Sequence, residues 1–63
     1  MNMLQENYKQ ELSQRIKETS DEISLLKNDY NSVVDEVCKS QIKTFLEKKQ
    51  LLLLDLYKQY EVI

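Results

Sequence analysis

The stretch Asn28-Asp29-Tyr30-Asn31-Ser32 decides the fold that this sequence predicts. It is a polar cluster just short of the middle of a 63-residue chain that contains no glycine and no proline. Long amphipathic segments flank the cluster, which is therefore the best candidate for a place where one helix ends and another begins. We expect it to form the turn of a helical hairpin.

The segment before this cluster has the spacing of an amphipathic helix. Its apolar or nearly apolar positions are Met1, Leu4, Tyr8, Leu12, Ile16, Thr19, Ile23 and Leu26. At about 100° per residue these positions fall on one stripe of a helix, whereas a strand would need strict alternation. Glu6 and Lys27 complement the dipole of a helix that starts and ends near them. The sequence predicts a helix over residues 3–27.

The segment after the cluster has a start signal and a second stripe. Ser32 is the predicted N-cap, with Asp35 and Glu36 in the first turn, and the predicted helix covers about residues 33–61. Its apolar stripe consists of Val34, Cys38, Ile42, Phe45, Leu46, Leu52, Leu53, Leu56, Tyr60 and Ile63. On one straight helix this stripe would begin roughly 80° around the axis from the first stripe, which favours a turn.

One continuous helix in a parallel coiled coil is the alternative. The 4-3-4-3 spacing of apolar residues runs without interruption from Leu12 through Tyr30 to Val37, as it would in an unbroken rod. The two readings differ in length, about 40 Å for the hairpin against about 90 Å for the rod.

The size of the chain predicts self-association. A single domain of residues 1–63 buries little apolar surface, and one cysteine with no histidine excludes an internal disulfide and a histidine-containing zinc site. We expect an all-α, two-helix antiparallel hairpin that forms a homodimeric four-helix bundle. The predicted oligomer core is Leu12, Ile16, Ile23, Leu26, Cys38, Ile42, Phe45, Leu52, Leu53, Leu56 and Tyr60.

Catalytic chemistry is not expected. Without histidine the chain has no imidazole base, and without glycine it has no phosphate-cradling loop, so we expect no enzyme activity, cofactor or metal. Cys38 lies on the apolar stripe, and we expect a buried, inert thiol. The start of the chain does not read as a signal peptide and no apolar run reaches about 20 residues, which predicts a cytoplasmic protein without a membrane span.

Protein-protein interaction is the predicted function, as a small helical oligomer acting as a structural or regulatory subunit. The expected partner is a second copy of the chain, another helical protein, or both. An RNA- or DNA-binding hairpin dimer is the alternative. Nucleic acid is not favoured, because the net charge is -2 and the lysines do not form one stripe.

Two further predictions concern single side chains. Leu51 and Leu54 lie opposite the core stripe, and Val33 and Val37 share that side, so we predict that these four contact a protein partner. If the hairpin turns near Tyr30, facing residue numbers add to about 60, which places Lys49 beside Glu11. We expect these two side chains to form an ion pair.

Overall fold

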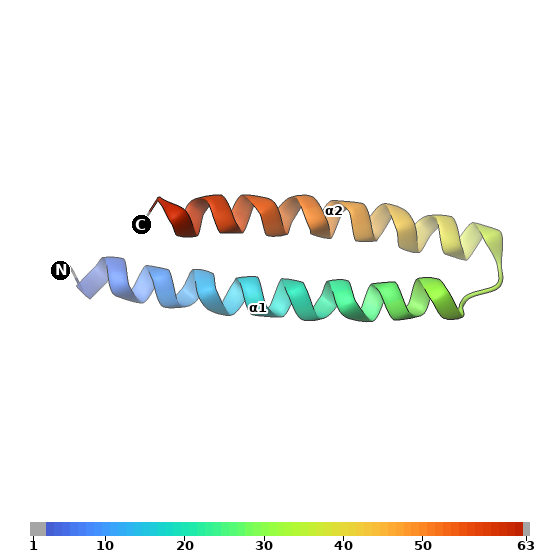
Figure 1. Cartoon of the computed structure of the whole chain (residues 1–63), viewed down its shortest axis with the longest axis horizontal. Helices are drawn as coiled ribbons and strands as arrows, with labels where there is room; N and C mark the ends of the chain where they lie inside the picture. The colour runs from blue at the N-terminus through green and yellow to red at the C-terminus, as the bar shows by residue number, and fades with distance from the viewer. Residues whose placement is uncertain (1–2, 63) are drawn as a thin grey trace.

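Two antiparallel helices form the structure, a computed structural model that describes residues 3–62 (Figure 1). Helix α1 covers Met3–Ser32 and helix α2 covers Glu36–Glu61. The helices lie side by side along their length, with both ends of the chain at one end of the molecule and the turn at the other (Figure 1). The predicted antiparallel hairpin is therefore confirmed, and the alternative of one continuous helix is wrong.

The turn lies later in the chain than the sequence predicted. Helix α1 continues through the whole polar cluster to Ser32, not to residue 27, and residues 33–35 connect it to α2. Ser32 is helical and its hydroxyl donates to the carbonyl of Asn28 at 2.9 Å, so it does not cap α2. The cost of polar residues within a helix is a few tenths of a kcal/mol each. Packing against α2 outweighs that cost.

Asp35 is the residue that starts α2. Its backbone is extended, and its carboxylate accepts hydrogen bonds from the backbone N–H groups of Val37 at 2.8 Å and Cys38 at 3.1 Å. These bonds satisfy two of the free donors that every helix start presents. No described residue has a positive φ angle, so the chain reverses without the left-handed conformation that glycine favours.

Four contacts between the helices fix the register. Tyr8 Oη donates to Gln59 Oε1 at 3.3 Å, and Lys49 Nζ lies 2.6 Å from Glu22 Oε2. Two lysine ammonium groups each lie 4.9 Å from the centre of a tyrosine ring across the hairpin, namely Lys9 over Tyr60 and Lys39 over Tyr30. The residue numbers in these pairs add to about 69, not to the predicted 60.

The predicted ion pair between Lys49 and Glu11 is therefore wrong, and Glu22 is the partner. Glu11 and Glu22 are separated by about three helical turns and lie within about 20° of each other around α1. Either carboxylate can point at α2, so the sequence pattern alone could not choose between them. The position of the turn determines which of the two carboxylates lies beside Lys49.

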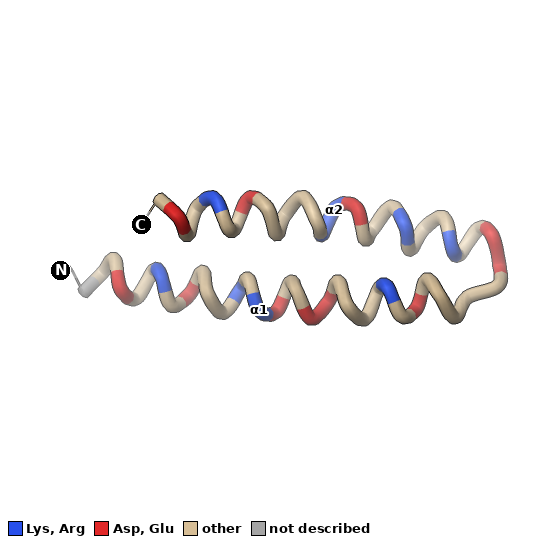
Figure 2. The backbone as a smooth tube through the Cα atoms, in the orientation of Figure 1, with Lys and Arg blue, Asp and Glu red and all other residues tan. Residues whose placement is uncertain are grey.

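The later turn also makes the molecule longer than expected. The Cα atoms extend over 51 × 14 × 11 Å, against the predicted length of about 40 Å. Acidic and basic residues are interspersed along both helices, as Figure 2 shows. The core is small: Leu12, Thr19, Ile23 and Leu56 are the buried residues among those described.

Most of the predicted core positions face the opposite helix. Buried or half-buried are Leu12, Ile16, Ile23, Leu26, Ile42, Leu53, Leu56 and Tyr60. Cys38, Phe45 and Leu52 are exposed in the single hairpin. The expectation of a buried Cys38 thiol therefore does not hold within one chain. A role of these three residues in an oligomer core stays a prediction.

Candidate interaction surfaces

An apolar groove lies between the helices in the half of the molecule that contains the turn. It consists of two adjoining hollows of about 410 Å³ and about 270 Å³, which share Leu26 and Phe45 as lining residues. The other lining residues are Val33, Cys38, Gln41 and Ile42 in the first hollow and Glu22, Leu25 and Lys49 in the second. Most of these side chains are apolar, so the groove presents a surface suited to apolar side chains of a partner.

The groove continues as an exposed apolar line along α2. Cys38, Phe45 and Leu52 are spaced by seven residues, and seven residues advance only about 20° less than two full turns, so the three share one side of the helix. Phe45 is 59% exposed and Leu52 is 43% exposed. Gln59 continues the same spacing to the open end, where it meets Tyr8. This side of the molecule, from the turn to Leu52, is called the groove face below.

Leu25 belongs to the groove face and was not among the predicted interaction residues. It is exposed at 64% and lines the smaller hollow. Glu18 and Glu11 lie seven and fourteen residues before Leu25, on the same side of α1. In the sequence, this side therefore resembles one that faces solvent. The signal that could have identified it is its neighbour Leu26, because two adjacent leucines widen the apolar stripe toward one side.

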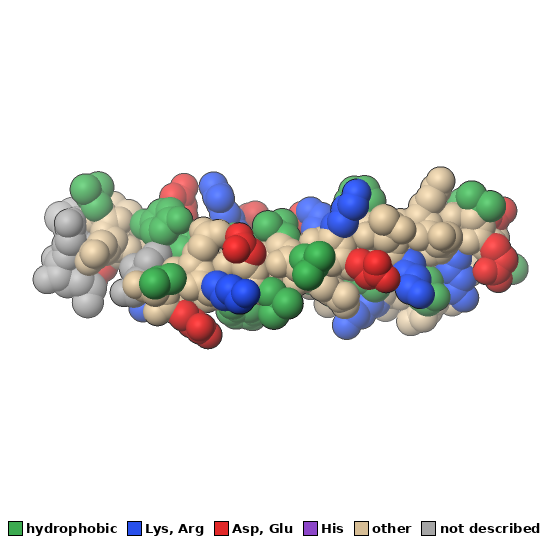
Figure 3. All heavy atoms as spheres, turned by 90° about the horizontal axis from the view of Figure 1, so that it is seen from above, with side chains coloured by type: hydrophobic (Ala, Val, Ile, Leu, Met, Phe, Trp, Pro, Cys, Tyr) green, Lys and Arg blue, Asp and Glu red, His purple; other side chains and the backbone are tan. Residues whose placement is uncertain are grey.

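The second predicted surface lies on the outer side of α2. Leu51 is 68% exposed, Leu54 is 59% exposed and Val37 is also exposed. Figure 3 views this outer side and shows separate apolar side chains among charged ones. Val33 does not share this side, because it lies in the turn and lines the groove. The structure thus brings Leu51 and Leu54 together and places Val33 elsewhere.

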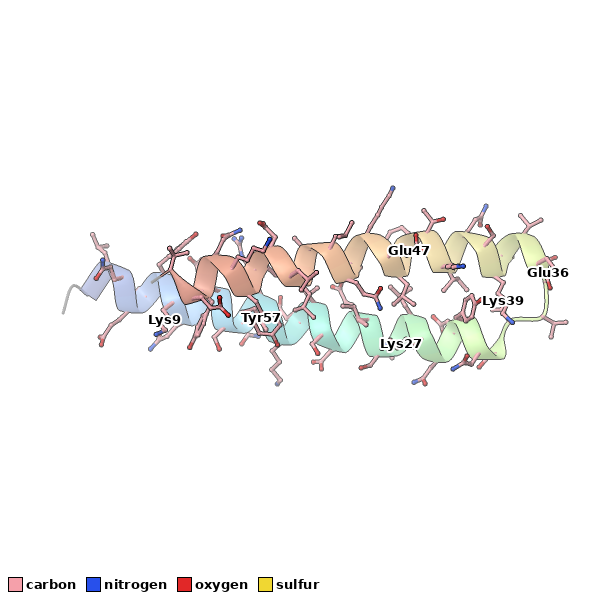
Figure 4. All side chains as sticks on the ribbon, turned by 45° about the horizontal axis from the view of Figure 1, so that its top comes forward. Lys9, Lys27, Glu36, Lys39, Glu47 and Tyr57 are labelled. Atoms are coloured by element: carbon pink, nitrogen blue, oxygen red, sulfur yellow. The ribbon has the colours of Figure 1, made fainter. Side chains whose placement is uncertain are left out.

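The opposite side of the hairpin is polar. One hollow there, of about 370 Å³, lies at the open end and includes Lys9 and Tyr60; another, of about 240 Å³, lies beside the turn and includes Tyr30 and Lys39. Figure 4 labels Lys9 and Lys39 near the two ends of this side. Each lysine over a tyrosine ring gains a cation–π attraction of about 0.5–1 kcal/mol at an exposed site. These contacts connect α1 to α2 and leave the groove face uncovered.

Charged residues are distributed without a basic stripe. Lys39 and Lys43 line the hollow beside the turn together with the acidic Glu36. Elsewhere along the described helices, acidic residues are interspersed with lysines and arginine (Figure 2). A surface that tracks a phosphate backbone needs a continuous row of positive charge. No such row runs along the described helices.

Within residues 3–62, no three histidine, cysteine, aspartate or glutamate side chains are grouped so that they could hold a metal ion. None of the described helices is long and apolar enough to span a membrane. No known protein family, curated protein or solved structure matches this chain.

Proposed function

We propose that this protein is a non-catalytic protein-protein interaction module, a helical hairpin that associates through its groove face and acts as a structural or regulatory subunit. The observation that carries the proposal is the groove together with the exposed Phe45 and Leu52 beside it. Apolar side chains that lie on one side of an amphipathic helix pair are the surface that a partner helix covers. Scattered surface residues would not share one helical side.

The small core supports association. Only three apolar side chains of the described residues are buried, which is little for a chain of 63 residues. The whole side of the molecule that includes the groove face measures 51 Å by 14 Å across its Cα atoms and covers about 700 Å². Two such faces together cover roughly 1,400 Å², within the range of stable interfaces. Covering the groove face would therefore add the apolar contact that the single hairpin lacks.

Leu51 and Leu54 offer a second contact. They are exposed on the outer side of α2, and charged residues of the same side surround them, including Lys58 and Glu47. Apolar anchors within a charged rim are typical of helix-in-groove recognition. We place the contact with a further helical partner, or with a higher assembly, at these two leucines.

The mass of the protein in solution tests the association. Sedimentation equilibrium between low micromolar and millimolar concentration should show an oligomer that dissociates on dilution, with helicity falling at the same concentrations. A well-folded monomer throughout this range would contradict the proposal. Changing Leu51 and Leu54 to glutamate should preserve helicity and this mass while abolishing capture of a further partner or any higher assembly.

A matched control for the double variant is Gln5→Glu with Gln10→Glu, which adds the same charge at exposed positions of α1. The control should behave as the wild type in both assays. If the Leu51 and Leu54 variant unfolds, those residues belong to the core of the assembly. If it keeps all its partners, the two leucines are ordinary surface.

The nucleic-acid alternative predicts a different result. A protein that reads phosphates must bind mixed RNA or DNA and lose affinity steeply as salt increases. We expect no binding at physiological salt. A cytoplasmic setting is part of our proposal, since an exposed single thiol such as Cys38 is compatible with a reducing compartment.

A further inference from the structure

We infer that the groove face is covered by a second copy of this chain, and that the two hairpins lie with their turns at the same end. In this arrangement α2 of each copy lies over α1 of the other, and the two-fold axis follows the long axis of the molecule. The inference rests on the proposed function, because it names the occupant and orientation of the same surface. Two independent features carry it, the position of the apolar residues and the charges at the edges of the face.

Apolar residues favour the same-end arrangement because they are gathered in one half of the face. Both hollows lie toward the turn, whereas the open end carries the hydrogen-bonded Tyr8 and Gln59. Rotation about the long axis keeps every residue at its own height. The apolar half of one copy therefore meets the apolar half of the other, and the open ends of the two copies also lie opposite each other, so the two hairpins are aligned along their full 51 Å length.

The same rotation places Phe45 against the smaller hollow of the other copy. Paired numbers across the hairpin add to about 69, so Phe45 is level with the Leu25 and Leu26 region of α1. Because α2 lies over the other copy's α1, Phe45 contacts Leu25 and Leu26 of the second copy. The contact is reciprocal, as a two-fold interface requires.

Charges at the two edges of the groove face are complementary in this arrangement. Lys48 lies on the α2 edge, level with residue 21 of α1, and so faces Glu18 of the second copy. Asp55 lies seven residues further on the same edge and faces Arg15 of the second copy. Opposite charges at matching heights select one orientation over others.

The opposite-end arrangement cannot satisfy both features. In that arrangement α2 of one copy packs on α2 of the other. If the contact is centred on Phe45, the apolar residues of the two copies lie opposite each other, but Asp55 of one copy lies at the height of Asp35 of the other. Centring it between Lys48 and Asp55 pairs those two charges but moves Cys38 beyond the end of the other α2. In both cases the acidic edge of α1 packs on the acidic edge of the other α1, which is unfavourable.

Distance measurement at the turn tests the orientation. Val34 is 90% exposed at the tip of the hairpin, so a nitroxide on Val34→Cys in a Cys38→Ser background should not disturb the groove face. We expect a spin–spin distance below about 25 Å, because the two tips are adjacent. Opposite-end packing predicts about 30 Å when centred on Phe45 and about 50 Å when the helices overlap fully, at 1.5 Å per residue.

A second label position serves as the control. Glu61→Cys in the same background marks the open end, and same-end packing predicts a short distance there too, whereas opposite-end packing centred on Phe45 predicts about 50 Å. A dimeric mass with long distances at both positions would overturn the orientation and leave the association intact. A monomeric mass without a dipolar signal would overturn the proposed function itself.

Exchange of edge charges gives an independent measurement. Lys48→Glu should weaken the dimer roughly tenfold, because it places like charges opposite each other in both symmetric contacts, and adding Glu18→Lys should restore affinity. Unchanged affinity in the single variant, or no recovery in the double variant, would contradict the proposed pairing. Circular dichroism at high concentration checks that both variants keep their helices.

Discussion

Replacing Phe45 with alanine should weaken self-association far more than it affects one hairpin. The side chain is 59% exposed in the single chain, so little of it supports the packing of α2 on α1. A phenylalanine buries on the order of 200 Å² when fully covered, which leaves about 120 Å² for a second copy to cover. If the dimer covers about half of this area, each copy gains about 60 Å² of apolar contact.

The expected effect follows from this area. At about 25 cal/mol per Å², 60 Å² contributes about 1.5 kcal/mol per copy and about 3 kcal/mol per dimer. Because 1.4 kcal/mol corresponds to a tenfold change in an equilibrium constant, the dissociation constant of the dimer should rise at least about a hundredfold. Full coverage of the ring, or a cavity left in its place, would raise the figure further.

Sedimentation equilibrium over a wide concentration range measures this constant directly. The matched control is Tyr57→Ala, an aromatic residue of α2 that is 45% exposed and lies about 120° around the helix from Phe45. Figure 4 labels Tyr57, which lies outside the groove face. The control should change the constant by only a few fold. A change below tenfold for Phe45→Ala, or equal effects of the two variants, would refute the assignment of the groove face as the association surface.

Two further predictions concern the turn and the register. Asp35→Ala should lower the free energy of unfolding by about 1 kcal/mol, because it removes the N-cap of α2. Ser32→Ala should be neutral or slightly stabilising. Urea unfolding measures both variants, and equal losses of stability would mean that the cap is misassigned. A double-mutant cycle between Glu22 and Lys49 should give a coupling of about 0.3–1 kcal/mol, since both groups are partly exposed. The same cycle with Glu11 should give none, and the reverse result would place the turn near Tyr30.

The amino-acid sequence by itself determined that this chain forms two helices on either side of a break. Apolar residues recur every three or four positions in both halves, and the phase of this pattern changes near the middle. These are local properties, so they can be read without knowledge of contacts between the helices. The same patterns identified the residues that face the opposite helix, with Leu12, Ile23 and Leu56 at the centre of the core.

Tertiary structure decided where the chain turns. The local signals for a turn are the helix-stop residues of the polar cluster and two possible caps of α2, Ser32 and Asp35. The turn positions that these signals favour differ by only about 1 kcal/mol or less in local free energy. Tyr30 is half-buried under Lys39 across the hairpin, a contact that exists only if α1 continues past residue 27. Continuation also explains why the apolar spacing through Leu26 and Tyr30 resembled an unbroken rod.

The register and the groove depend on that turn. Moving the turn by a few residues shifts facing positions by about twice as many, which changed the partner of Lys49 from Glu11 to Glu22. It also placed Val33 in the groove instead of on the outer side of α2. The periodicity of a helix determines on which side of it each side chain lies. Which side chains meet across a hairpin depends on how the two helices pack together, and a one-dimensional pattern does not contain that information.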